Sequence, residues 1–133
     1  GYDTCIFLNE VGKVAEGPGS CFFMIRGNQL ITPRLTDSVL ESITRDTVIK
    51  LAVEELGMEF VERTIDRTEV YMADEAFLCG SAMEVTPIYT VDKYAIGTGE
   101  QGPKTKAIHL KYLEAAQGKL EKYQDWLTPI YEK

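Results

Sequence analysis

The feature that most constrains the fold of this chain is a short apolar run, Cys-Phe-Phe-Met-Ile at residues 21–25. Turn residues bound it on both sides, with Gly-Pro-Gly at 17–19 and Arg-Gly-Asn at 26–28. An apolar run of this length between turns predicts a buried β-strand over 20–25. Because a second apolar stretch at 29–32 follows at once, we expect the two strands to pair as a hairpin.

A similar arrangement stands at the start of the chain. Residues 4–8 and 13–16 are predicted to be strands around Asn-Glu-Val-Gly at 9–12, where asparagine and glycine supply turn conformations. The chain is therefore expected to open with two consecutive hairpins.

One carboxylate, Glu16, stands directly before the Gly-Pro-Gly turn and the apolar run. Glutamate is rarely buried without a partner, and an unpaired carboxylate beside a core strand is costly. Either the turn carries Glu16 into water, or a cationic group pairs with it.

The middle of the chain predicts a helix. The stretch from Ser38 to Glu41 has the spacing of a capping box, and Thr44 is positioned to cap a second helix start. Gly57 is expected to end the helix. The apolar positions that share one helical face are Val48, Leu51, Ala52 and Leu56.

Short strands are predicted over 60–65, 76–79 and 85–91. Pro87 interrupts the last of them, and proline in a strand is confined to an edge, an end or a bulge.

Two further helical segments accompany these strands. Thr68 is expected to cap a short helical turn at 69–72. A longer helix over 104–117 follows Pro103, which suits the first helical position, and ends at Gly118. The order of elements predicts an α/β fold with a mixed sheet and helices.

Composition limits the class of protein. The chain has 133 residues, 44% of them apolar, so residues 1–133 are expected to form one domain with one core. A net charge of −7 argues against nucleic acid or an anionic membrane as a partner. No stretch is long and apolar enough to span a bilayer and no signal peptide is recognisable, so we expect a soluble protein. The three cysteines are expected to be reduced core residues, which indicates a cytoplasmic protein.

Three stretches place small or flexible residues beside apolar strand ends, where backbone N–H groups can face a ligand: 16–19, 42–44 and 80–83. The predicted helix start provides the N–H groups of Ile43 and Thr44 and the Thr44 hydroxyl, which suit a phosphate, although an ordinary helix cap is the simpler explanation. Small residues at 80–83 allow a close approach to the backbone and to the Ser81 hydroxyl, although a tight turn is the simpler explanation there.

Four stretches carry a resemblance to a known family; in chain order they are VAEGPGSCFFMI, LITPRLTDSVLESITRDTVIKLA, YMADEAFLCGSAMEVTPI and IGTGEQGPKTKAI. They resemble the fold type IV pyridoxal-phosphate enzymes, also called class IV aminotransferases. Among these, the resemblance is greatest to the branched-chain amino acid aminotransferases. The resemblance runs from Gly1 to about residue 128. It implies an α/β fold with a mixed, partly barrel-like sheet and flanking helices, the large C-terminal domain of the D-amino acid aminotransferase-like fold. The GPKTKAI and EVTPI stretches favour the branched-chain branch.

The resemblance implies that pyridoxal 5'-phosphate is the cofactor. Glu16 matches the glutamate that pairs with the pyridine nitrogen, where a carboxylate keeps the nitrogen protonated. Ile43 and Thr44 match the residues that bind the cofactor phosphate. Ser81 stands where the family usually has a threonine that also reaches the phosphate.

Two more roles are implied by the resemblance. Leu40 matches a residue packed against the cofactor ring, and the amides of Ser81 and Ala82 match those that receive the substrate carboxylate. Glu16, Thr44 and Ser81 are therefore expected to share an open cleft.

The chain departs from the family pattern at two places. The family commonly has Glu-Asn where this chain has Ser20 and Cys21, and a thiol cannot reproduce the paired donor and acceptor of asparagine. Ser42 stands where the family commonly has glycine, so this chain has an additional side chain beside the expected phosphate site.

In the family, the lysine that forms the Schiff base lies upstream of the segment that corresponds to Gly1, and no lysine of this chain lies in a matching context. The chain is therefore expected to be the C-terminal domain of a longer aminotransferase, inactive alone and binding the cofactor weakly or not at all. The expected substrates are branched-chain amino acids and 2-oxo acids, and the parent is expected to be a homodimer or a dimer-based oligomer. The alternatives are a D-amino acid aminotransferase, an aminodeoxychorismate lyase and a non-catalytic α/β binding module.

Overall fold

The apolar run lies in strand β2 (Ser20–Arg26), inside a mixed sheet with the order β4-β3-β2-β5-β6. The computed structural model describes residues 2–34, 43–81 and 83–120. The other strands of this sheet are β1 (Glu16–Gly17), which pairs with β2, β3 (Gln29–Thr32), β4 (Glu59–Glu62), β5 (Glu75–Gly80) and β6 (Glu84–Pro87).

The hairpin predicted around the second turn is confirmed. Strands β2 and β3 are antiparallel, with Arg26 opposite Gln29, so Gly27 and Asn28 alone form the turn. Gly27 has a φ of 59°, which costs glycine little. Helix α1 (Ile43–Glu54) then leads to β4, which pairs with β3 in parallel. A parallel pair needs such a crossover connection.

Strand β2 is buried because layers cover both faces of the sheet. Successive strand residues point to opposite faces, so Phe23 and Ile25 pack in one hydrophobic cluster while Phe22 and Met24 pack in another. Phe23 stacks on Phe77 of β5, with the ring centroids 5.1 Å apart. The sheet therefore separates two cores.

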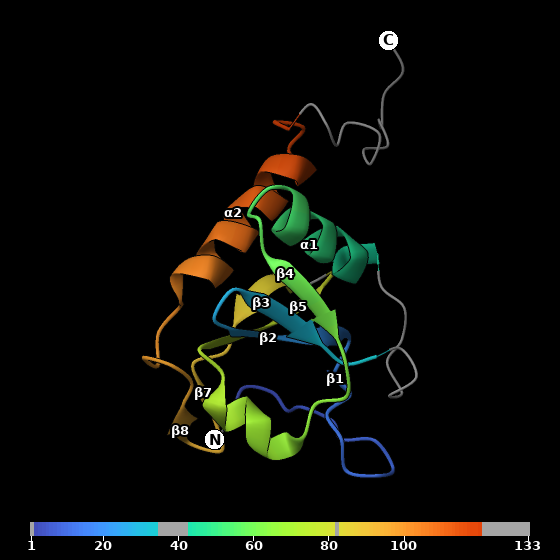
Figure 1. Ribbon diagram of the computed structural model, residues 1–133, viewed down its shortest axis with the longest axis vertical. Helices are drawn as coiled ribbons and strands as arrows, with labels where there is room; N and C mark the ends of the chain where they lie inside the picture. The colour runs from blue at the N-terminus through green and yellow to red at the C-terminus, as the bar shows by residue number, and fades with distance from the viewer. Residues whose placement is uncertain (1, 35–42, 82, 121–133) are drawn as a thin grey trace.

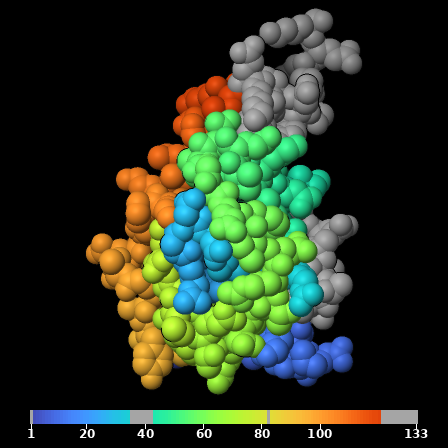
Figure 2. Space-filling view, in the orientation of Figure 1, coloured from blue at the N-terminus to red at the C-terminus, as the bar shows by residue number. Residues whose placement is uncertain are grey.

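Helices α1 and α2 (Pro103–Ala116) lie side by side on the first face, as Figure 1 shows. They gather at one end of the molecule in Figure 2. Pro103 occupies the start of α2, and Gly118 follows its end with a φ of 74°, both as predicted. No helix in the described ranges combines the length and apolar character needed to cross a bilayer.

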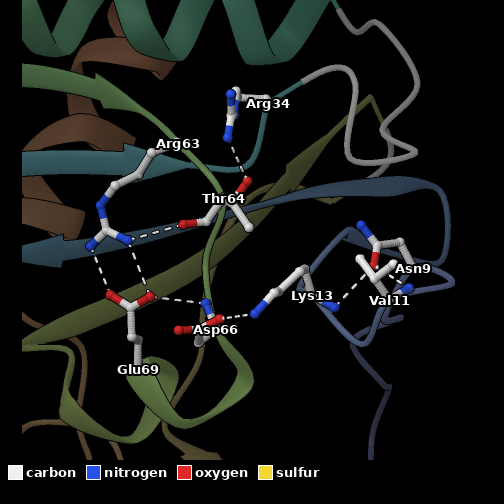
Figure 3. A network of polar contacts seen from close by, with 8 residues as sticks. All are labelled: Asn9, Val11, Lys13, Arg34, Arg63, Thr64, Asp66 and Glu69. Atoms are coloured by element: carbon white, nitrogen blue, oxygen red, sulfur yellow. Dashed lines mark hydrogen bonds and ion pairs between the residues drawn. The ribbon is translucent and has the colours of Figure 1, made fainter.

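The second face is covered by the 3₁₀ helix η2 (Arg67–Met72) and by the N-terminal segment. Figure 3 shows the polar network that joins them. The Arg63 guanidinium donates hydrogen bonds to both oxygens of Glu69, at 2.8 and 3.1 Å, and Lys13 forms an ion pair with Asp66. The bond from Arg63 is the main reason why the pKa of Glu69 is lowered from 4.5.

The first predicted hairpin forms only in part. Residues 4–8 are not a strand, and Leu8 makes an isolated bridge to Val14. The two arms still bond to each other, since the Phe7 N–H donates to the Glu16 carbonyl oxygen at 2.7 Å. Most of the first arm is exposed, and the described part of the chain places no strand on its other side.

The predicted helix caps need correction. Asp66, and not Thr68, precedes η2, and its N–H donates to Glu69 Oε2 at 2.9 Å. Thr44 lies inside α1 rather than at a cap. The predicted capping box at 38–41 lies outside the described residues.

The α/β class with a mixed sheet and flanking helices is confirmed. The described strands leave the sheet open, with β4 and β6 at its edges, so they form no closed barrel. Pro87 is the last residue of edge strand β6, as proline requires. Two short strands, β7 (Thr90–Val91) and β8 (Tyr94–Ala95), pair separately.

Candidate functional site

Two of the chain segments expected at the site touch through their backbones. Gly19 belongs to the turn after Glu16, and Gly80 ends β5 just before Ser81. A Cβ atom placed on Gly80 would lie 2.7 Å from the Gly19 carbonyl oxygen, closer than a carbon atom can approach an oxygen without strain. Glycine at position 80 therefore allows the Gly-Pro-Gly turn to pack directly against the end of β5.

The sheet register places Glu16 in one row with two cysteines. Glu16 pairs with Cys21 across β1 and β2, and Cys21 pairs with Cys79 across β2 and β5. Paired residues present their side chains on the same face of a sheet, and Cys21 and Cys79 belong to the core that α1 and α2 cover. The partly buried Glu16 side chain is therefore on the helix-bearing face.

The two thiols of this row interact with each other. The pKa of Cys79 is raised, mainly by a hydrogen bond with Cys21 and next by burial. None of the three cysteines, all of which lie in the described residues, forms a disulfide; Cys21 and Cys79 lie in the core, as predicted, whereas Cys5 is exposed. Cys21, one of the departures from the family pattern, thus fills a cross-strand pair, whereas the buried Ser20 hydroxyl has no hydrogen-bond partner in the described residues.

Helix α1, which begins at Ile43, packs on the same face of the sheet. Ile43 is exposed and Thr44 is buried, and α1 packs against β5. The N–H groups of a first helical turn have no partner within the helix, and such groups commonly bind an anion. Leu40 and Ser42, which precede the turn, lie outside the described residues.

Ser81 directly follows β5 and is exposed, while Ala82 lies outside the described residues. Two cavities of about 330 and 380 Å³ lie around Leu78 and Ile88 on the opposite face, and neither includes Glu16, Thr44 or Ser81. A cleft shared by these three residues stays a prediction.

The available groups fit the cofactor that the resemblance implies. Hydroxyl and N–H donors at Thr44 and Ser81 suit a phosphate, and a carboxylate at Glu16 suits a protonated ring nitrogen. These residue types suit an anion at Thr44 and Ser81 and a cation at Glu16, and their roles in binding stay a prediction. No cluster of residues in the described ranges has the ligands for a metal ion.

Sequence reasoning missed a polar contact that holds α2. The Glu75 carboxylate accepts hydrogen bonds from the N–H of Thr105 at 2.7 Å and of Lys104 at 3.3 Å. It lies so close to Gly102 that a Cβ there would be 2.1 Å from Glu75 Cδ. The Gly-Pro-Lys-Thr motif thus receives a carboxylate from β5, a long-range contact that no local pattern signals.

Comparison with known proteins finds class IV aminotransferases. The family model for amino-transferase class IV matches residues 1–91. The probable branched-chain-amino-acid aminotransferase of Aquifex aeolicus is 49% identical over 133 residues, which are 100% of this chain and 43% of the relative. The chain thus spans under half the length of such curated relatives.

Solved structures share the fold over nearly the whole chain. A branched-chain amino acid aminotransferase from Thermobaculum terrenum, in its pyridoxal-phosphate form, has a TM-score of 0.96 and 54% identity, covering 99% of this chain and 43% of that one. The T.th. branched-chain amino acid aminotransferase, complexed with N-(5'-phosphopyridoxyl)-L-glutamate, has a TM-score of 0.92 and 39% identity, with 97% and 43% coverage. The chain therefore belongs to the amino-transferase class IV family.

Proposed function

We propose that this chain is the cofactor-binding C-terminal domain of a pyridoxal-phosphate-dependent aminotransferase, which moves the amino group of leucine, isoleucine or valine to 2-oxoglutarate. The observation that carries the proposal is the backbone contact between Gly19 and Gly80, because it joins the Glu16 segment to the Ser81 segment. The relatives' names support the branched-chain substrate, and the phosphopyridoxyl-glutamate complex of a relative supports glutamate as the second amino acid.

Glu16 is proposed to hold a proton on the pyridine nitrogen. Its partial burial, beside Cys21 in the sheet, strengthens a charge pair because nearby water is reduced. When bound, the cofactor supplies an electron sink for the electrons left when an amino acid loses its α-proton. The carboxylate keeps that sink cationic.

The cofactor phosphate is assigned to the first turn of α1 and to the end of β5. Ile43 and Thr44 offer backbone N–H groups and a hydroxyl, and Ser81 offers an exposed hydroxyl. Leu40, from the stretch before the helix, is assigned to the cofactor ring. These donors hold the phosphate without proton transfer, so their task is binding and orientation.

The backbone N–H groups of Ser81 and Ala82 are assigned to the substrate carboxylate. In this proposal the lysine that bonds the cofactor belongs to a part of the enzyme outside these 133 residues, so the chain alone is inactive and binds the cofactor weakly or not at all. The parent enzyme is proposed to be a homodimer or a dimer-based oligomer.

Steady-state rates of the full-length enzyme that contains this chain test the proposal. We expect the highest kcat/KM with L-leucine, L-isoleucine and L-valine as donors and 2-oxoglutarate as acceptor. A preference for D-alanine, or turnover of aminodeoxychorismate in place of L-leucine, would replace the proposal with one of the other activities known for this fold. Absence of all three activities would favour a non-catalytic binding module.

A further inference from the structure

Arg45 is a buried cation in the first turn of α1, next to Thr44. Its side chain is 4% exposed. Nη2 donates a hydrogen bond to Glu62 Oε2 at 2.7 Å and another to the Pro33 carbonyl oxygen at 3.4 Å. Asp46 lies 3.7 Å from Nη1. The guanidinium thus contacts a carboxylate and a carbonyl oxygen from outside its own helix and one carboxylate within the helix.

The two acceptors outside α1 lie at the ends of neighbouring strands. Glu62 is the last residue of β4, and Pro33 directly follows β3. These strands run parallel, with Thr32 opposite Glu62, so their C-terminal ends lie next to each other. Arg45 therefore ties the first helical turn to the sheet at a point defined by two strands.

Packing of the rest of α1 does not need this charge. Val48 and Ala52 bury apolar side chains against the sheet core, and burying a guanidinium costs free energy that an apolar residue would not cost. An ion pair of this kind adds direction, since a planar guanidinium accepts only a narrow range of partner positions. Such a pair can fix where the first helical turn lies.

The Arg45 charge also reaches the row that contains Glu16. A hydrogen bond with Cys21 and burial raise the pKa of Cys79, while the positive charge of Arg45 lowers it. Cys79 pairs with Cys21, which pairs with Glu16. The guanidinium charge therefore acts on Cys79, one residue before the end of β5.

We propose that Arg45 is a positioning residue for the phosphate-binding turn: through Glu62 and the Pro33 carbonyl it holds the N–H groups of Ile43 and Thr44 where the cofactor phosphate binds. The assignment rests on the proposed function above. Arg45 itself does not contact the phosphate in this proposal. A displacement of about 1 Å in such a turn can cost about 10²-fold in a function that depends on geometry.

The test measures the dissociation constant of pyridoxal 5'-phosphate in the full-length enzyme, together with the free energy of unfolding and amide hydrogen exchange of the first α1 turn. Arg45→Met is expected to raise the dissociation constant by about tenfold or more and to speed exchange at the turn. Glu62→Gln is expected to produce a smaller rise, and Arg45→Lys to recover part of the affinity. Glu62→Gln also serves as the informative variant should Arg45→Met fail to fold.

Val48→Ala is the matched control, because it weakens the packing of α1 without changing the Arg45 contacts. It is expected to lower stability and leave cofactor affinity within about twofold of wild type. Equal losses of affinity in Val48→Ala and in the Arg45 or Glu62 variants, at equal loss of stability, would show a merely structural role and overturn the assignment. Wild-type affinity in both Arg45→Met and Glu62→Gln would also overturn it while leaving the proposed function intact. A wild-type enzyme that does not bind pyridoxal 5'-phosphate would overturn the proposed function, and this assignment with it.

Discussion

The carboxylate of Glu75 is expected to be a main support of helix α2. Removing it in Glu75→Ala deprives the N–H groups of Thr105 and Lys104 of the oxygens that lie 2.7 and 3.3 Å away. The N-cap residue Gly102 has no side chain to replace them. The first turn of α2 would then depend on water.

The expected loss follows from two contributions. Loss of an N-terminal cap costs about 1 kcal/mol, and loss of a negative charge at a helix N-terminus costs about 0.3–1 kcal/mol more. Glu75→Ala should therefore lower the free energy of unfolding by about 1.3–2 kcal/mol. Glu75→Gln keeps one oxygen acceptor, enough for the shorter bond from Thr105, but it loses the charge and the second accepting oxygen, so it should cost less than Glu75→Ala.

Urea denaturation of both variants measures these losses. Glu10→Ala is the control, because Glu10 is exposed and its removal changes the net charge equally. A second check uses Gly102→Ala, whose Cβ would lie 2.1 Å from Glu75 Cδ and should be better tolerated when Glu75 is already alanine. A cost below about 0.5 kcal/mol for Glu75→Ala, or additive effects in the double variant, would refute the capping role.

Acid stability should depend on Glu69. Because the hydrogen bond from Arg63 lowers its pKa from 4.5, the pair stabilises the fold above pH 4.5 and this contribution is lost as pH falls through the lowered pKa. The unfolding free energies of wild type and Glu69→Gln should therefore converge in acid, and parallel curves would contradict the pair. Among the three thiols, only exposed Cys5 should react quickly with a disulfide reagent in the native state, because Cys21 is buried and the raised pKa of Cys79 disfavours its thiolate. Rapid labelling of all three without denaturant would show that the reagent reaches Cys21 and Cys79 in the folded protein.

Local patterns predicted the parts of the fold that depend on neighbouring residues. The β2–β3 hairpin follows from an apolar run and a glycine turn, and α1 follows from the 3.6-residue spacing of Val48, Leu51 and Ala52. Contacts between distant segments could not be predicted in this way. The parallel pairing of β3 with β4 and the position of β5 beside β2 join segments far apart in the sequence. Such pairings depend on tertiary packing and not on neighbouring residues.

The candidate site divides in the same manner. The residue types at Glu16, Thr44 and Ser81 suggested a carboxylate and phosphate donors, and the family resemblance gave each of them an expected role toward the cofactor. The close approach of Gly19 to Gly80, and the anchoring of α1 through Arg45, appear only in three dimensions. Thr44 was expected to cap a helix and instead lies within it, because the local cap signal cannot show where tertiary packing lets a helix begin.

The pairing of Glu16 with the cofactor ring nitrogen is the central claim, and one comparison tests it most directly. The full-length enzyme and its Glu16→Gln variant, each with its content of pyridoxal 5'-phosphate measured, are assayed with L-leucine and 2-oxoglutarate, with Glu10→Gln as the control for charge. We expect Glu16→Gln to retain bound cofactor and to lose about 10²-fold or more in kcat, while Glu10→Gln keeps the wild-type rate. A wild-type kcat in cofactor-loaded Glu16→Gln would contradict the claim.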